Sequence, residues 1–69
     1  MLTEAALKSY LLDMPSGHIF DLTYVQLAGM FPPGATSADS RAKLDALAVA
    51  CNCTVINNKA ESRFELTRR

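Results

Sequence analysis

The sequence lacks the long apolar run that a membrane-spanning helix requires, about 20 residues, and it has no tryptophan. Met1 to Glu4 also lack the basic region and apolar block of a signal peptide. We therefore expect no contact with a membrane and a cytoplasmic localisation.

Cysteine and histidine are too scarce for a closed metal site. Cys51 and Cys53 lie two positions apart, too close for an ordinary disulfide between them. In a reducing cytoplasm they are expected to be reduced and to pack as small apolar groups. Adding His18, the single histidine, gives three ligands, short of a tetrahedral zinc set. We expect no metal and no cofactor.

No pattern typical of catalysis is present. The carboxylates are scattered singly, so no acid and base pair stands out. No serine or cysteine nucleophile can be matched to His18 with a third, orienting residue. Ser16-Gly17-His18 lacks the several glycines and the lysine of a phosphate-binding loop. We therefore expect no catalytic residue and no enzyme.

The composition fits one small globular domain, residues 1–69, because 49% of the residues are hydrophobic and 20% are charged. The formal net charge is zero, but residues 1–36 carry −2 (one Lys, three Asp and Glu) and residues 37–69 carry +2 (six Arg and Lys, four Asp and Glu). The basic second half favours a nucleic-acid surface, whereas overall neutrality argues against DNA binding.

Periodicity, capping residues and breakers predict an α+β domain with three helices and a C-terminal hairpin. The predicted helices cover residues 3–14, 23–31 and 37–51, and the hairpin strands cover 53–57 and 62–67. A short extended piece at 18–22 is long enough for one small strand. Thr3, Thr23 and either Thr36 or Ser37 are the expected helix caps.

The predicted core draws on all three helices and both hairpin strands: Leu7, Leu11, Leu27, Leu44, Leu47, Val55 and Phe64. Val25 and Ala28 are expected on the buried face of the second helix. Asn52 is expected to end the third helix in a left-handed conformation. Asn57 and Asn58 are expected to supply positive φ in the hairpin turn, and Arg68-Arg69 are expected to form a frayed basic tail.

A family resemblance rests on the middle and the end of the chain. Thr23-Tyr-Val-Gln-Leu-Ala28, then a turn, then Ser37 to Leu47 with Arg41 and Leu44, resembles the two-helix unit of the winged helix-turn-helix superfamily. The segment from Thr54 to Thr67 looks like its wing. The turn departs from the family pattern, because Phe31-Pro-Pro-Gly-Ala35 lengthens it and puts the docking angle of the third helix in doubt.

The resemblance implies that the N-terminal half of the third helix enters a major groove of double-stranded DNA and that the wing touches the backbone or the minor groove. The implied DNA-binding residues are Ser37, Ser40, Arg41, Lys43, Lys59 and Arg63. Each also has a purely structural reading: Ser37 as a cap, Arg41 as a partner of Asp45, Lys59 as a solvated turn residue. Asp39 argues against DNA, because a carboxylate at the leading end of a reading helix repels phosphate.

Two functions stay open. One is a small DNA-binding transcriptional regulator of a bacterium, phage or plasmid, which needs a second copy or another partner, bound through the helix-one surface around Tyr10 and Leu12. The other is a protein-interaction module without DNA binding, such as an assembly subunit or a phage-encoded inhibitor of a host enzyme. A DNA binder must gather its cations on one face, whereas an adaptor is expected to expose a contiguous apolar patch.

Overall fold

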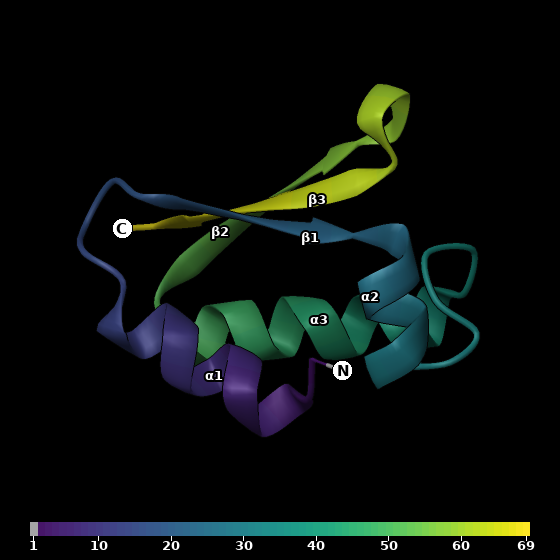
Figure 1. The fold of residues 1–69 in the computed structure, drawn as a ribbon, viewed down its shortest axis with the longest axis horizontal. Helices are drawn as coiled ribbons and strands as arrows, with labels where there is room; N and C mark the ends of the chain where they lie inside the picture. Colours follow the sequence, from purple (N-terminus) through teal and green to yellow (C-terminus); the bar gives the residue numbers. More distant parts are fainter. Residues whose placement is uncertain (1) are drawn as a thin grey trace.

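Three helices lie on one face of a three-stranded antiparallel sheet, in a computed structural model that describes residues 2–69 (Figure 1). The elements in chain order are α1 (Glu4–Asp13), β1 (Ile19–Thr23), α2 (Tyr24–Met30), α3 (Ala38–Ala50), β2 (Cys53–Asn58), the 3-10 turn η1 (Lys59–Glu61) and β3 (Arg63–Arg68). The predicted α+β class, the three helices and the hairpin are confirmed, with helix ends within one residue of those expected.

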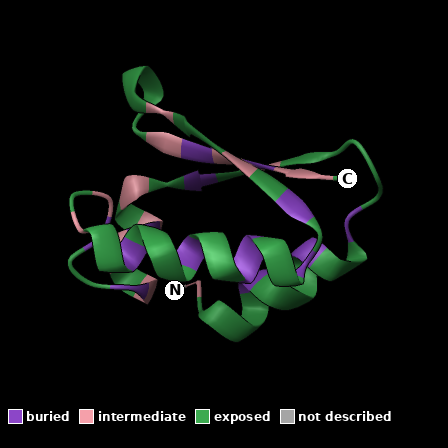
Figure 2. Cartoon of the chain, turned by 180° about the vertical axis from the view of Figure 1, so that it is seen from behind, coloured by how far each residue is buried: buried purple, intermediate pink, exposed green. Residues whose placement is uncertain are grey.

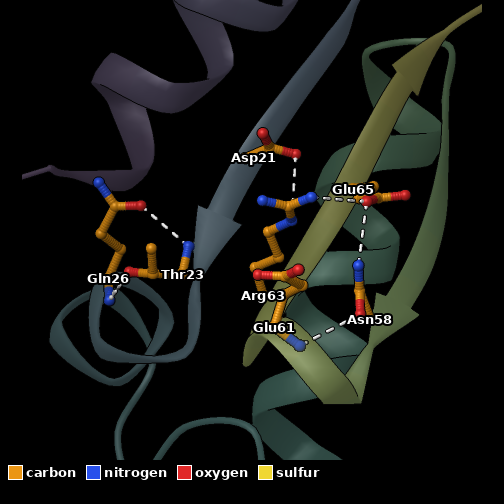
Figure 3. Close-up of polar contacts among 7 residues, drawn as sticks. All are labelled: Asp21, Thr23, Gln26, Asn58, Glu61, Arg63 and Glu65. Atoms are coloured by element: carbon orange, nitrogen blue, oxygen red, sulfur yellow. Dashed lines mark hydrogen bonds and ion pairs between the residues drawn. The ribbon is translucent and has the colours of Figure 1, made fainter.

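The helices begin at the expected capping residues. The hydroxyls of Thr3 and Ser37 accept backbone N–H groups at the starts of α1 and α3. Thr23 forms a full capping box with Gln26, each side chain accepting the other's backbone N–H at 3.1 and 3.0 Å (Figure 3). Because such bonds satisfy N–H groups that the helix itself leaves without partners, each fixes a helix start locally.

The strand order is β1-β3-β2, so β3 is the central strand. The predicted hairpin pairs β2 with β3, and the short extended piece after α1 becomes β1, which pairs along the other edge of β3. Phe64 and Leu66 of β3 point toward the helices and are buried, while the alternate positions face outward. The sheet is therefore more than a simple hairpin, because β1 completes it.

The core contains six of the seven predicted residues, and the seventh, Val55, is half-buried against it. The full set of buried apolar residues is Leu7, Leu11, Met14, Leu22, Leu27, Phe31, Leu44, Leu47, Ala48, Cys51, Cys53, Phe64 and Leu66. The prediction for Val25 is wrong, since its side chain is 82% exposed. Two residues two positions apart lie about 200° apart around a helix, so Val25 and Leu27 cannot share a buried face.

The turn between β2 and β3 differs from the prediction. Positive φ is found at Ser62 (54°) rather than at Asn57 or Asn58. Asn58 instead caps η1, its Oδ1 accepting the backbone N–H of Glu61 at 3.2 Å. Because η1 directly follows β2, the positive φ that reverses the chain lies at Ser62, the residue before β3. At the end of α3 the prediction is confirmed, with Asn52 at φ 59°.

The lengthened turn between α2 and α3 folds back onto α2. Gly34 has φ +110°, and a Cβ at this position would lie 2.9 Å from the Cβ of Ala28. Glycine is therefore required both for the backbone conformation and for the close approach. Phe31, at the start of the turn, is buried in the core, which anchors the turn.

The predicted frayed tail is wrong. Arg68 belongs to β3, and its Nη1 donates to the carbonyl oxygens of Leu11 at 2.7 Å and Leu12 at 3.2 Å. The last turn of α1 carries no basic residue of its own. A cation at a helix C-terminus is favourable, so Arg68 supplies from the sheet the cap that α1 lacks.

Candidate nucleic-acid interface

Arg41 of α3 and Lys59 of the hairpin tip line one groove of about 390 Å³. The two cations come from elements far apart in the sequence, and Figure 1 shows the hairpin projecting at the same end of the molecule as α2 and the start of α3. The lining residues are Tyr24, Ala35, Thr36, Arg41, Asn57 and Lys59. None of them is acidic, so the groove joins two of the predicted cations in surroundings without a carboxylate.

Lys43 lies apart from this pair. Two positions along an α-helix correspond to about 200° of rotation, so Arg41 and Lys43 project from opposite flanks of α3. The Nζ of Lys43 stands 6.0 Å from the ring centroid of Phe31, on the side where α2 ends. Arg41 and Lys43 therefore cannot both bind the same phosphate.

The two predicted serines serve the protein itself. The hydroxyl of Ser37 caps α3 by accepting the backbone N–H of Ser40 at 3.3 Å. Ser40 is 1% exposed, and its Oγ accepts the backbone N–H of Gly34 at 3.3 Å. Ser40 therefore cannot reach DNA, and its prediction as a DNA-binding residue is wrong. It occupies the core face of α3, four residues before Leu44.

Arg63 is engaged by acidic neighbours on the outer face of the sheet. Its Nε lies 3.7 Å from Oδ1 of Asp21, and its Nη2 donates to Oε2 of Glu65 at 3.3 Å (Figure 3). The same Glu65 oxygen accepts Nδ2 of Asn58 at 3.3 Å. With two carboxylates around one guanidinium, Arg63 offers no uncompensated charge to a phosphate. Its assignment as a DNA contact stays a prediction, and these two ion pairs weigh against it.

The outward face of α3 is made of small apolar residues with two carboxylates. Figure 2 shows this face largely exposed. Its exposed apolar residues are Ala38, Ala42, Ala46, Val49 and Ala50. Val49 is 72% exposed, and Asp39 and Asp45 are exposed on the same helix. Arg41 makes no ion pair with Asp45, since within residues 2–69 the ion pairs are those of Arg63.

Tyr24 and Asn57 are groove residues that the sequence did not point to. The Tyr24 hydroxyl donates a hydrogen bond to Oδ1 of Asn57, joining the start of α2 to β2. The Tyr24 ring packs on Phe64, with the centroids 5.2 Å apart and the planes tilted by 46°. The contact depends on how the hairpin is placed against α2, for which no local pattern gives a signal.

The remaining chemical groups do not form a second site of the same quality. Cys51 and Cys53 are free and buried, and burial, followed by the neighbouring Cys51, raises the pKa of the Cys53 thiol. His18 is exposed beside Asp13 in a separate groove of about 320 Å³. Across residues 2–69 no three His, Cys, Asp or Glu residues are grouped to hold a metal ion. In the same range, no helix has the length and apolarity needed to span a bilayer.

The surface suggested for self-association, around Tyr10 and Leu12, is exposed as expected. Tyr10 contacts Phe20 of β1 edge-on, with the ring centroids 4.9 Å apart.

Comparison with protein-family models, with curated proteins and with solved structures finds no match for this chain. The chemistry of the groove therefore carries the functional inference.

Proposed function

We propose that this chain is a small winged-helix protein that binds double-stranded DNA and acts as a regulator. In this proposal α2 and α3 form the helix-turn-helix unit, and β2, η1 and β3 form the wing. One observation carries the proposal: Arg41 of α3 and Lys59 of the wing line the same groove without an acidic neighbour in it. A winged-helix domain meets a duplex with these two elements together.

The number of free cations limits the expected affinity. Arg63 is compensated by Asp21 and Glu65, and Lys43 lies on the other flank of α3. Two phosphate contacts correspond to a slope of log affinity against log salt of about −1.8. Contact by a single copy should therefore be weak, and useful affinity would come from two copies on adjacent half-sites.

The test is a fluorescence anisotropy titration of the full chain with a random-sequence duplex at several salt concentrations. We expect binding that weakens with salt at a slope near −1.8 for each copy bound. Lys8→Ala is a matched control, because Lys8 is an exposed lysine on α1, away from the groove. The control should bind with wild-type affinity. A folded protein without salt-sensitive affinity for duplex would overturn the proposal.

A second candidate, a protein-interaction module, is favoured by the outward face of α3. That face presents exposed Val49 and several alanines, together with Asp39 and Asp45, where a DNA-reading helix would need donors. This candidate predicts no affinity for duplex at low salt. It also predicts co-purification of a specific protein partner, which Val49→Asp would abolish without lowering the melting temperature.

A further inference from the structure

We propose that the Arg41–Lys59 groove binds two neighbouring backbone phosphates of the DNA, one at each cation, and that Tyr24 is a positioning residue that turns the Asn57 amide toward them. The inference rests on the proposed function and deepens it. It assigns a third donor to the site, the Nδ2 group of Asn57, and it gives the Tyr24 hydroxyl a role beyond joining α2 to the wing.

Arg41 and Lys59 are held in different ways, and the positive charge of each is available to a ligand. The Nε of Arg41 donates to the carbonyl oxygen of Ser37 at 3.4 Å, which anchors the guanidinium at the first turn of α3 and leaves its Nη groups for a ligand. A guanidinium with two parallel donors matches two phosphate oxygens. Lys59, the first residue of η1, adds a second positive charge to the same groove.

Asn57 lies in the same groove, and its orientation decides whether it helps or opposes an anion. An asparagine side chain has an oxygen that accepts and a nitrogen that donates. Because the Tyr24 hydroxyl donates to Oδ1, the oxygen is engaged. Within residues 2–69, Nδ2 has no hydrogen-bond partner, so its two donors remain for a ligand. A rotated amide would bring its oxygen toward the anion and repel it.

The Tyr24 hydroxyl is itself held in place by the packing of its ring. The ring lies against buried Phe64 of β3, so α2, the wing and the hydroxyl are fixed together. Thr36, which also lines the groove, precedes the cap of α3. The donors in the groove thus come from the turn before α3, from α3 itself and from the junction of β2 with η1.

The decisive variants change one group each and have matched controls. Asn57→Asp keeps the size of the side chain but places a carboxylate beside the phosphates, and we expect at least roughly tenfold weaker binding to random duplex. Asn52→Asp is the control, because it adds the same charge at an exposed position at the C-terminal end of α3. It should change affinity far less than Asn57→Asp.

Tyr24→Phe tests positioning. It removes only the hydroxyl, so we expect a loss of about two- to tenfold in affinity with an unchanged salt slope, since no charge is removed. Thr54→Val is the matched control, because it removes an exposed hydroxyl that donates to the carbonyl oxygen of Thr67 at 3.5 Å, at the other end of β2; it should bind as wild type does. In 15N spectra, the side-chain amide signals of Asn57 should shift on titration with duplex in wild type and much less in Tyr24→Phe.

The outcomes separate this inference from the proposed function. Wild type that binds duplex while Asn57→Asp binds equally well would overturn the phosphate site and leave DNA binding standing. Wild type that binds no duplex would overturn the proposed function. Inorganic pyrophosphate then tests the groove itself. A shift of the Asn57 side-chain amide signals that is lost when Arg41→Ala and Lys59→Ala are combined supports an anion site, and the absence of a shift in wild type overturns one.

Discussion

Arg41 and Arg63 are both cations of the positively charged half of the chain, yet they lie in opposite electrostatic surroundings. Arg41 shares its groove with Lys59 and has no ion-pair partner within residues 2–69. Arg63 stands between Asp21 and Glu65 on the outer face of the sheet (Figure 3). The number of basic residues in a segment therefore does not give the net positive charge that its surface offers to a phosphate.

The difference arises from the elements that carry the two arginines. The outer face of a strand brings cross-strand neighbours within reach, and Asp21 of β1 and Glu65 of β3 are paired in register. The start of α3 instead contributes to a groove that it shares with the β2–η1 segment, which supplies Asn57 and Lys59. The following predictions test this contrast.

The largest effect is expected from removing both groove cations. Arg41→Ala combined with Lys59→Ala should lower affinity for random duplex roughly 100-fold, taking about 1.4 kcal/mol for each charged contact. The salt slope should become flatter by about 1.8. Anisotropy titration at several salt concentrations measures both. Wild-type binding by this variant would show that the groove is not the interface.

Ser40→Ala should affect stability and not binding. The substitution leaves the backbone N–H of Gly34 without its acceptor inside the protein, which should cost about 1–3 kcal/mol in the free energy of unfolding. Urea unfolding followed by circular dichroism measures this cost. The folded fraction should bind duplex as wild type does. Unchanged stability together with weakened binding would return Ser40 to the interface.

Arg63→Ala tests the difference between Arg63 and the groove cations most directly, because it removes one positive charge just as Lys59→Ala does. The ion pairs of Arg63 are partly exposed, so we expect a loss below about 1 kcal/mol in the free energy of unfolding. The salt slope of DNA binding should stay within error of wild type. A slope flattened as much as by Lys59→Ala would show that Arg63 also meets phosphate.

The smallest effect is expected from the thiol of Cys53, which is buried on the inner side of the hairpin. Burial, and then the neighbouring Cys51, raises the pKa of the Cys53 thiol. As the pH rises above about 8.5, the ordinary value, the unfolded chain therefore loses this proton before the folded protein does. The free energy of unfolding should fall there until the pH passes the folded pKa.

Urea unfolding at neutral and alkaline pH tests this last prediction. The difference in stability between wild type and Cys53→Ala should narrow as the pH rises, because only wild type loses the thiol contribution. Parallel pH profiles for the two proteins would contradict it.

Much of the fold was predictable because its signals are local. The caps Thr3, Thr23 and Ser37 each accept an N–H group only three residues away, so the sequence alone places the helix starts. Asn52 ends α3 by its own backbone conformation. The predictions failed at Val25, because residues two positions apart were assigned to one helix face, and in the turn, because Ser62 and not Asn57 or Asn58 has positive φ.

The positions of the helices and strands and the basic character of the second half of the chain follow from local sequence signals. Which of these cations lack an ion pair within residues 2–69 depends on how the elements pack together. Asp21 reaches Arg63 through the pairing of β1 with β3, and Arg68 turns inward to cap α1. Tyr24 meets Asn57 only because the hairpin folds over α2. Capping acts between residues near in sequence, whereas charge compensation falls off with distance in space.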